Sequence, residues 1–130
     1  MNIELDRLEY SFLNKPLLIG GRAKEYYNIR KSGKDIDLVV SSSDFQNLSE
    51  LFPENKKEIY GDLGVCPMDF EIWKTIRGYD YEFLSKQSIE LEDMKIINLE
   101  VLLFLTAQAA SIDKYKKDSE LILEKLTSSS

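Results

Sequence analysis

The sequence predicts an α/β (α+β) fold: a small mixed β-sheet with helices packed mainly on one face and a helical carboxyl terminus. Short apolar or alternating runs, typical of strands, are separated by segments with helical periodicity, and two helical segments end the chain. With 130 residues, 43% of them apolar, the chain is long enough for one domain with its own core. We expect a single domain over residues 1–126 and a disordered tail over 127–130.

The helices are predicted from apolar residues that recur at intervals of three and four. Ser41 to Ser43, with Asp44, cap a helix that runs up to Pro53, and Asn98 caps a later one. Phe45, Leu48, Leu51 and Phe52 form the expected buried stripe of the first of these. The predicted helices cover residues 2–13, 22–30, about 44–52, 98–110 and 113–126.

The strands are predicted where apolar residues are continuous or alternate between turn residues. In the run that ends at Trp73, we expect Met68, Phe70 and Ile72 on the buried face. Residues 61–64 are expected to form a turn, and residues 79–88 fit either a helix or a strand. The predicted strands cover residues 16–19, 34–40, 57–60, 68–73 and 95–97.

Composition excludes several kinds of chemistry. The chain has no histidine and one cysteine, so it has no internal disulfide, no typical zinc site and no serine–histidine or cysteine–histidine catalysis. Carboxylates remain, and any metal must be held by oxygen. No apolar run approaches the roughly 20 residues that span a bilayer, and the acidic amino terminus does not resemble a signal peptide. We therefore expect a cytoplasmic protein without a membrane partner.

The charge is distributed unevenly. The net charge is −6, yet residues 15–34 hold six basic residues against Glu25 alone, a local charge of +5. The overall acidity argues against broad duplex DNA binding, whereas the local patch suits a small phosphorylated ligand.

Two short motifs flank this basic segment. Leu18-Ile19-Gly20-Gly21 ends an apolar strand in a glycine pair, whose backbone can approach phosphate oxygens without interference from a Cβ. The helix that follows offers free amides, and Arg22, Lys24 and Lys34 add positive charge. With thirteen residues between it and Gly21, Asp35-Ile36-Asp37-Leu38 places two carboxylates on one face of a strand, with Cα atoms roughly 6.5 Å apart. Either motif alone is commonly a plain turn or strand edge; together they predict a site for Mg²⁺ or Mn²⁺ and a polyphosphate.

A third carboxylate would help to position and deprotonate an attacking hydroxyl group. Asp69 and Glu71 are the candidates, because both lie opposite the apolar face of their strand, and Glu71 is preferred. A solvated strand face is the alternative for both. Tyr26, Tyr27 and Trp73 are candidates for stacking on a nucleobase, with a place in the core as the alternative.

These motifs resemble those of the nucleotidyltransferase superfamily that includes DNA polymerase beta, in particular its minimal stand-alone members. The resemblance implies transfer of a nucleoside monophosphate, with AMP as the expected group, from a nucleoside triphosphate to a hydroxyl group. It implies that Gly20 and Gly21 hold the triphosphate, that Asp35 and Asp37 bind Mg²⁺ or Mn²⁺, and that Glu71 or Asp69 is the third acid. Lys114 with Lys117-Asp118 resembles a late-helix motif of some small relatives, although a solvated helix face has the same spacing.

The acceptor is left open as a small molecule, a protein or an RNA end. No second domain for recognising it is evident, so a second copy or a partner subunit is a further expectation. The alternative function is a catalytically silent relative that serves as a binding or regulatory, antitoxin-like protein.

Overall fold

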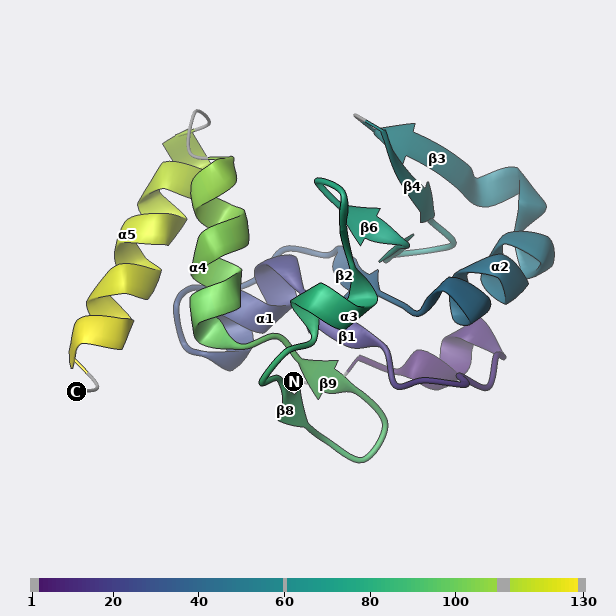
Figure 1. The fold of residues 1–130 in the computed structure, drawn as a ribbon, viewed down its shortest axis with the longest axis horizontal. Helices are drawn as coiled ribbons and strands as arrows, with labels where there is room; N and C mark the ends of the chain where they lie inside the picture. Colours follow the sequence, from purple (N-terminus) through teal and green to yellow (C-terminus); the bar gives the residue numbers. More distant parts are fainter. Residues whose placement is uncertain (1–2, 60, 110–112, 129–130) are drawn as a thin grey trace.

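A mixed seven-stranded sheet organises the computed structural model, which describes residues 3–59, 61–109 and 113–128 (Figure 1). The strands are β1 (Leu17–Ile19), β2 (Ile36–Val39), β3 (Lys56–Ile59), β4 (Asp62–Val65), β5 (Phe70–Trp73), β6 (Thr75–Ile76), β7 (Tyr79–Asp80), β8 (Ile89–Glu90) and β9 (Lys95–Ile96). Their order in the sheet is β3-β4-β5-β2-β1-β9-β8, and β6 pairs with β7 in a separate hairpin. The central strand β2 is antiparallel to β1 and parallel to β5.

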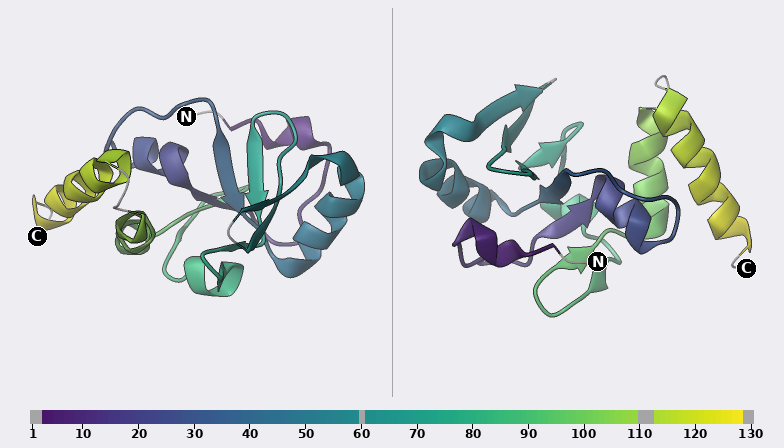
Figure 2. Two further views of the ribbon diagram at one scale, coloured as in Figure 1. Left: turned by 90° about the horizontal axis from the view of Figure 1, so that it is seen from above. Right: turned by 180° about the vertical axis from the view of Figure 1, so that it is seen from behind.

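The helices surround this sheet and end the chain. They are α1 (Gly20–Tyr26), α2 (Ser42–Leu51), α3 (Tyr81–Leu84), α4 (Leu99–Gln108) and α5 (Asp113–Ser128), with 3₁₀ turns η1 (Leu5–Leu8) and η2 (Pro53–Asn55). The packed pair α4 and α5 lies at one end of the molecule and the β3–β4 hairpin at the other (Figure 1). Seen from behind, α1 continues directly from β1 (Figure 2). The prediction of a mixed sheet with a helical carboxyl terminus is confirmed.

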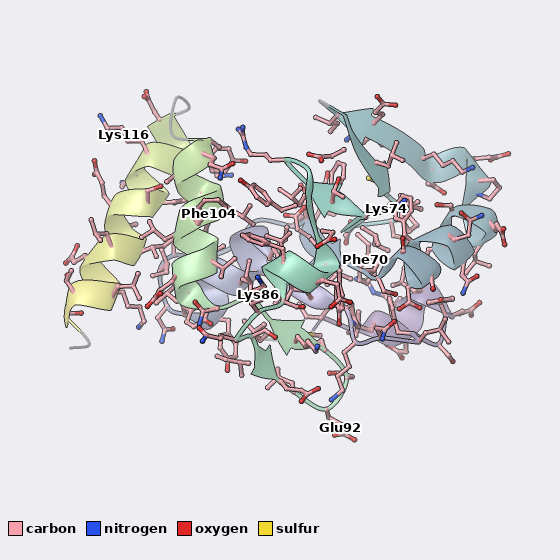
Figure 3. All side chains as sticks on the ribbon, in the orientation of Figure 1. Phe70, Lys74, Lys86, Glu92, Phe104 and Lys116 are labelled. Atoms are coloured by element: carbon pink, nitrogen blue, oxygen red, sulfur yellow. The ribbon has the colours of Figure 1, made fainter. Side chains whose placement is uncertain are left out.

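The core lies where the three central strands meet. Residues 17–19 of β1 are all buried, and so are Ile36 and Leu38 of β2. In β5, Phe70 and Ile72 are fully buried, and Phe70 lies in the centre of the molecule (Figure 3). This packing fixes the strands that carry the glycine turn and the carboxylates.

The amino-terminal helix predicted over residues 2–13 is wrong: within residues 3–13 only the turn η1 is helical. The carboxylate of Asp44 explains the difference. It accepts hydrogen bonds from the backbone N–H groups of Leu13 (2.8 Å) and Asn14 (2.9 Å) and from the hydroxyl of Tyr10 (2.6 Å). These bonds hold the segment against α2, and Leu13 is left exposed. The local periodicity is overridden by a long-range polar contact.

Other boundaries also differ from the predictions. The predicted turn over residues 61–64 belongs largely to strand β4, Met68 is exposed rather than buried, and Leu51 is exposed on α2. Helix α1 begins at Gly20 and ends at Tyr26, and α5 continues to Ser128, into the predicted tail. The predicted caps are confirmed: Ser41 Oγ accepts from the Asp44 N–H, and Asn98 Oδ1 from the Glu100 N–H.

Residues 2, 60, 110, 129 and 130 of the predicted elements and tail lie outside the described residues. Within the described ranges, no helix combines the length and the apolar composition required to cross a bilayer.

Candidate active site

The glycine turn lies directly against Asp37. Ile19 ends β1 and is paired with Asp37 in the β1–β2 register. Gly20 then adopts a left-handed conformation (φ +64°), which favours glycine. A Cβ at Gly20 would overlap with Oδ2 of Asp37. Any other residue at position 20 would therefore displace either the turn or the carboxylate.

Asp37 and Glu71 form a carboxyl pair across two parallel strands. They are register partners in β2 and β5, so their side chains emerge on the same face, and a hydrogen bond links them. Burial raises the pKa of Asp37 from 3.8 to about 8, and the hydrogen bond and negative charge of Glu71 act in the same direction. At neutral pH and without a cation, the pair holds a proton.

Trp73 is a residue whose role sequence reasoning missed. It lies two residues beyond Glu71 in β5, and its side chain hydrogen-bonds the Asp37 carboxylate, which lowers the pKa of Asp37. Its ring is 7% exposed and covers the place that a Cβ would occupy on Gly64. Trp73 is therefore not a free stacking surface, contrary to that hypothesis. Its position could be inferred from strand alternation, because residues 71 and 73 lie on the same face of β5.

The two tyrosines differ. The Tyr27 hydroxyl donates to the Ile97 carbonyl (2.7 Å), which ties α1 to the residue after β9. Tyr26 packs edge-on against Tyr27 and is 37% exposed. Only Tyr26 keeps a surface on which a base could stack.

The other two candidate carboxylates are not members of the pair. Asp35 is exposed, just before β2, and its charge raises the pKa of Asp37 further. Asp69 forms ion pairs with Lys34 (3.7 Å) and Arg7 (3.9 Å). The structure therefore places Glu71, and not Asp69, beside Asp37.

The second glycine has space around it. A Cβ on Gly21 would meet nothing closer than Ser32 Cβ at 3.6 Å and Arg30 Nη1 at 3.7 Å. Nearby, Arg22 Nη2 donates to the Lys34 carbonyl (3.3 Å), whereas Arg22 Nε is buried with no hydrogen-bond partner among the described residues. A buried N–H group without a partner is costly and suggests a missing acceptor.

Lys24 does not contribute to this patch, contrary to the prediction. Its ammonium group is buried and bonded to Asp118 of α5 at 2.9 Å. The side chain of Lys24 is directed to α5, because the buried carboxylate of Asp118 is its partner there. Lys34 is 82% exposed and keeps its charge at the surface.

Asp118 is 2% exposed, so it does not belong to a solvated helix face, whereas Lys114 and Lys117 are exposed.

Lys57 of β3 and Cys66, the residue after β4, also adjoin the pair. Lys57 Nζ of β3 lies 3.9 Å from Oε1 of Glu71. Burial raises the pKa of the Cys66 thiol, and the negative charge of Glu71 raises it further. No local sequence signal indicates either residue, because both reach the site through the register of β3, β4 and β5.

The donor chemistry fits a hard divalent cation. Within the described residues no three histidine, cysteine or acidic side chains are grouped as a ready metal site. Two carboxyl groups do meet, Asp37 and Glu71. Burial first, and the neighbouring Glu71 second, raise the pKa of Asp37, and a cation would favour its ionised form. Asp35 lies two residues before Asp37, on the exposed segment that leads into β2.

No family model, curated protein or solved structure matches this chain in the comparisons made. The site is therefore described by its own geometry: a left-handed glycine turn in contact with Asp37, which faces Glu71 across two parallel strands.

Proposed function

We propose that this protein is a metal-dependent nucleotidyltransferase. It transfers a nucleoside monophosphate, with AMP as the expected group, from a nucleoside triphosphate to a hydroxyl acceptor. The observation that carries the proposal is the position of Asp37, which contacts the Gly20 turn on one side and Glu71 on the other. A polyphosphate at the turn would thus lie next to the carboxylates that bind its cation.

The chain supplies the phosphate site through its backbone and its cations. Gly21 leaves space beside the turn, and the Arg22 Nε–H group lacks an acceptor among the described residues. Lys34 is exposed on the segment that leads into β2. These groups favour an anion, although the protein as a whole is acidic.

Asp35, Asp37 and Glu71 would hold Mg²⁺ or Mn²⁺. A bound cation would activate the attacking hydroxyl group and stabilise the leaving pyrophosphate. The acceptor oxygen forms a bond to the α-phosphorus, and the bond from the α-phosphorus to the oxygen that bridges it to the β-phosphate breaks, so that pyrophosphate leaves. Glu71 accepts the hydroxyl proton. Trp73 favours the ionised form of Asp37, the form that would bind a cation.

Calorimetric titration with each of the four ribonucleoside triphosphates and Mg²⁺ tests the proposal. We expect the wild-type protein to bind at least one of them. Asp35→Asn combined with Asp37→Asn should weaken binding more than about tenfold, because two ligands of the cation lose their charge. Asp6→Asn combined with Asp93→Asn, two exposed aspartates outside the site, is the charge-matched control and should bind as the wild type does.

A transfer assay with α-labelled triphosphate then identifies the acceptor among small molecules, proteins and RNA ends. If no triphosphate binds with either Mg²⁺ or Mn²⁺, the proposal fails. A silent binding module would instead keep its partner protein after both aspartates of the site are changed.

A further inference from the structure

A buried ionic cluster joins α5 to the chain that follows the glycine turn. Asp118 Oδ2 accepts from Lys24 Nζ and its Oδ1 from Arg30 Nε, both at 2.9 Å. The side chains of Lys24 and Asp118 are each 3% exposed. Lys24 belongs to α1 and Arg30 to the loop after it, so one carboxylate of the last helix fixes both ends of this segment.

The guanidinium group of Arg30 lies beside Gly21. Its Nη1 donates to the Lys31 carbonyl (2.9 Å) and is 3.7 Å from the position of a Cβ on Gly21. Arginine has five N–H groups, and Asp118 and Lys31 take two of them. The other three have no partner among the described residues, and the side chain is 24% exposed. The guanidinium group of Arg30 is thus held in place and still has N–H groups that can bind a ligand.

We propose that Arg30 binds the polyphosphate of the nucleotide on the Gly21 side of the turn, and that Asp118 is the positioning residue that holds it there. The inference rests on the proposed function and adds to it a further phosphate ligand and a role for α5. A guanidinium group suits this task because its planar donors match phosphate oxygens in pairs. Gly21 suits it because a larger residue would stand between Arg30 and the ligand.

Asp118 allows positioning to be separated from general electrostatics. Asp118→Asn removes a negative charge near the anion, so electrostatics alone predicts tighter binding. The positioning role predicts weaker binding, because the amide no longer orients Arg30 with a full charge.

The test measures the affinity for inorganic tripolyphosphate with Mg²⁺ by calorimetry, with circular dichroism as the check on folding. Arg30→Gln should weaken binding about tenfold, the effect of losing a hydrogen bond to a charged group. Asp118→Asn should weaken it about threefold or more. Lys31→Gln removes the same charge from the neighbouring exposed residue and should change the affinity less than about twofold.

Each result decides one question. If the wild-type protein binds neither tripolyphosphate nor any nucleoside triphosphate, the proposed function fails and this inference with it. If the wild type binds and Arg30→Gln binds equally well, the inference fails while the proposed function stands. Equal or tighter binding by Asp118→Asn overturns the positioning role. If that variant does not fold, Arg30→Lys provides the test, because lysine keeps the positive charge but lacks the planar, paired donors of a guanidinium group. Unchanged affinity of Arg30→Lys would overturn the inference.

Discussion

At the scale of single residues, Asp37 has the most unusual environment in the site. It is a carboxyl group packed between a glycine turn and a second carboxyl group. Burial and Glu71 together disfavour its ionised form, and Trp73 opposes them only in part. Such an arrangement destabilises the metal-free protein when Asp37 is ionised, and on the proposed function a bound cation would offset this cost. The strain is located where the proposed chemistry needs it.

The raised pKa of Asp37 predicts how stability depends on pH in the metal-free protein. Between its ordinary value of 3.8 and about 8, the folded state binds more protons at this group than the unfolded state does. Asp37 therefore contributes a loss of stability as pH rises through this window, at most about 1.4 kcal/mol for each pH unit. Relative to the wild type, Asp37→Asn should gain stability from pH 5 to pH 8. Urea unfolding in the presence of EDTA measures this difference.

Asp35→Asn is the control, because Asp35 is exposed and only adjoins the pair. It should keep most of the wild-type pH dependence. A difference between Asp37→Asn and the wild type that stays constant from pH 5 to pH 8 would contradict the shift in pKa.

The two glycines predict opposite effects of alanine. Gly20→Ala should lower the free energy of unfolding by about 1–3 kcal/mol, because the Cβ overlaps with Asp37 and the backbone is left-handed. Gly21→Ala should fold as stably as the wild type, since its Cβ would make only ordinary contacts, but it should weaken nucleotide binding. Thermal unfolding and triphosphate titration separate the two effects. Gly33→Ala, at a position with open space, should change neither.

At the scale of elements, β4 is the clearest difference between expectation and structure. Gly61, just before β4, and Gly64 within it indicate a turn, but of these two only Gly61 has a left-handed backbone. Gly64 is a strand residue that makes room for the Trp73 ring, whose carbons lie 2.7–2.8 Å from the place of a Cβ. The glycine is thus explained by a contact across the sheet, which local sequence cannot reveal.

Gly64→Ala should therefore disturb the site from a distance. The added methyl group would displace Trp73, at a cost of about 1–3 kcal/mol in stability. The emission of Trp73, the chain's one tryptophan, should change with it. Leu63→Ala, at the exposed neighbour in β4, should change stability by less than about 0.5 kcal/mol and leave the emission as it was. An unchanged spectrum in Gly64→Ala would count against the link between β4 and the site.

At the scale of the whole molecule, sequence reasoning succeeded where the signal is local. The turn at Gly20 and the strand of Asp37 follow from adjacent residues, and the mixed sheet follows from the alternation of short strands with helices. The choice of Glu71 over Asp69 depends on the β2–β5 register, which one sequence does not specify. The burial of Asp118 depends on a contact 94 residues away, with Lys24. Strand register and contacts between residues far apart in the chain are therefore the features that one sequence does not specify.

The placement of β2 between β1 and β5 has a consequence for the growing chain. Residues 20 and 37 lie within the first 40 residues of the chain, whereas Glu71 belongs to β5, about 30 residues further on. A nascent or truncated chain that lacks β5 would carry the turn without its full set of ligands. On the proposed function, a chain that ends before β5 should therefore fail to bind a nucleotide together with its cation.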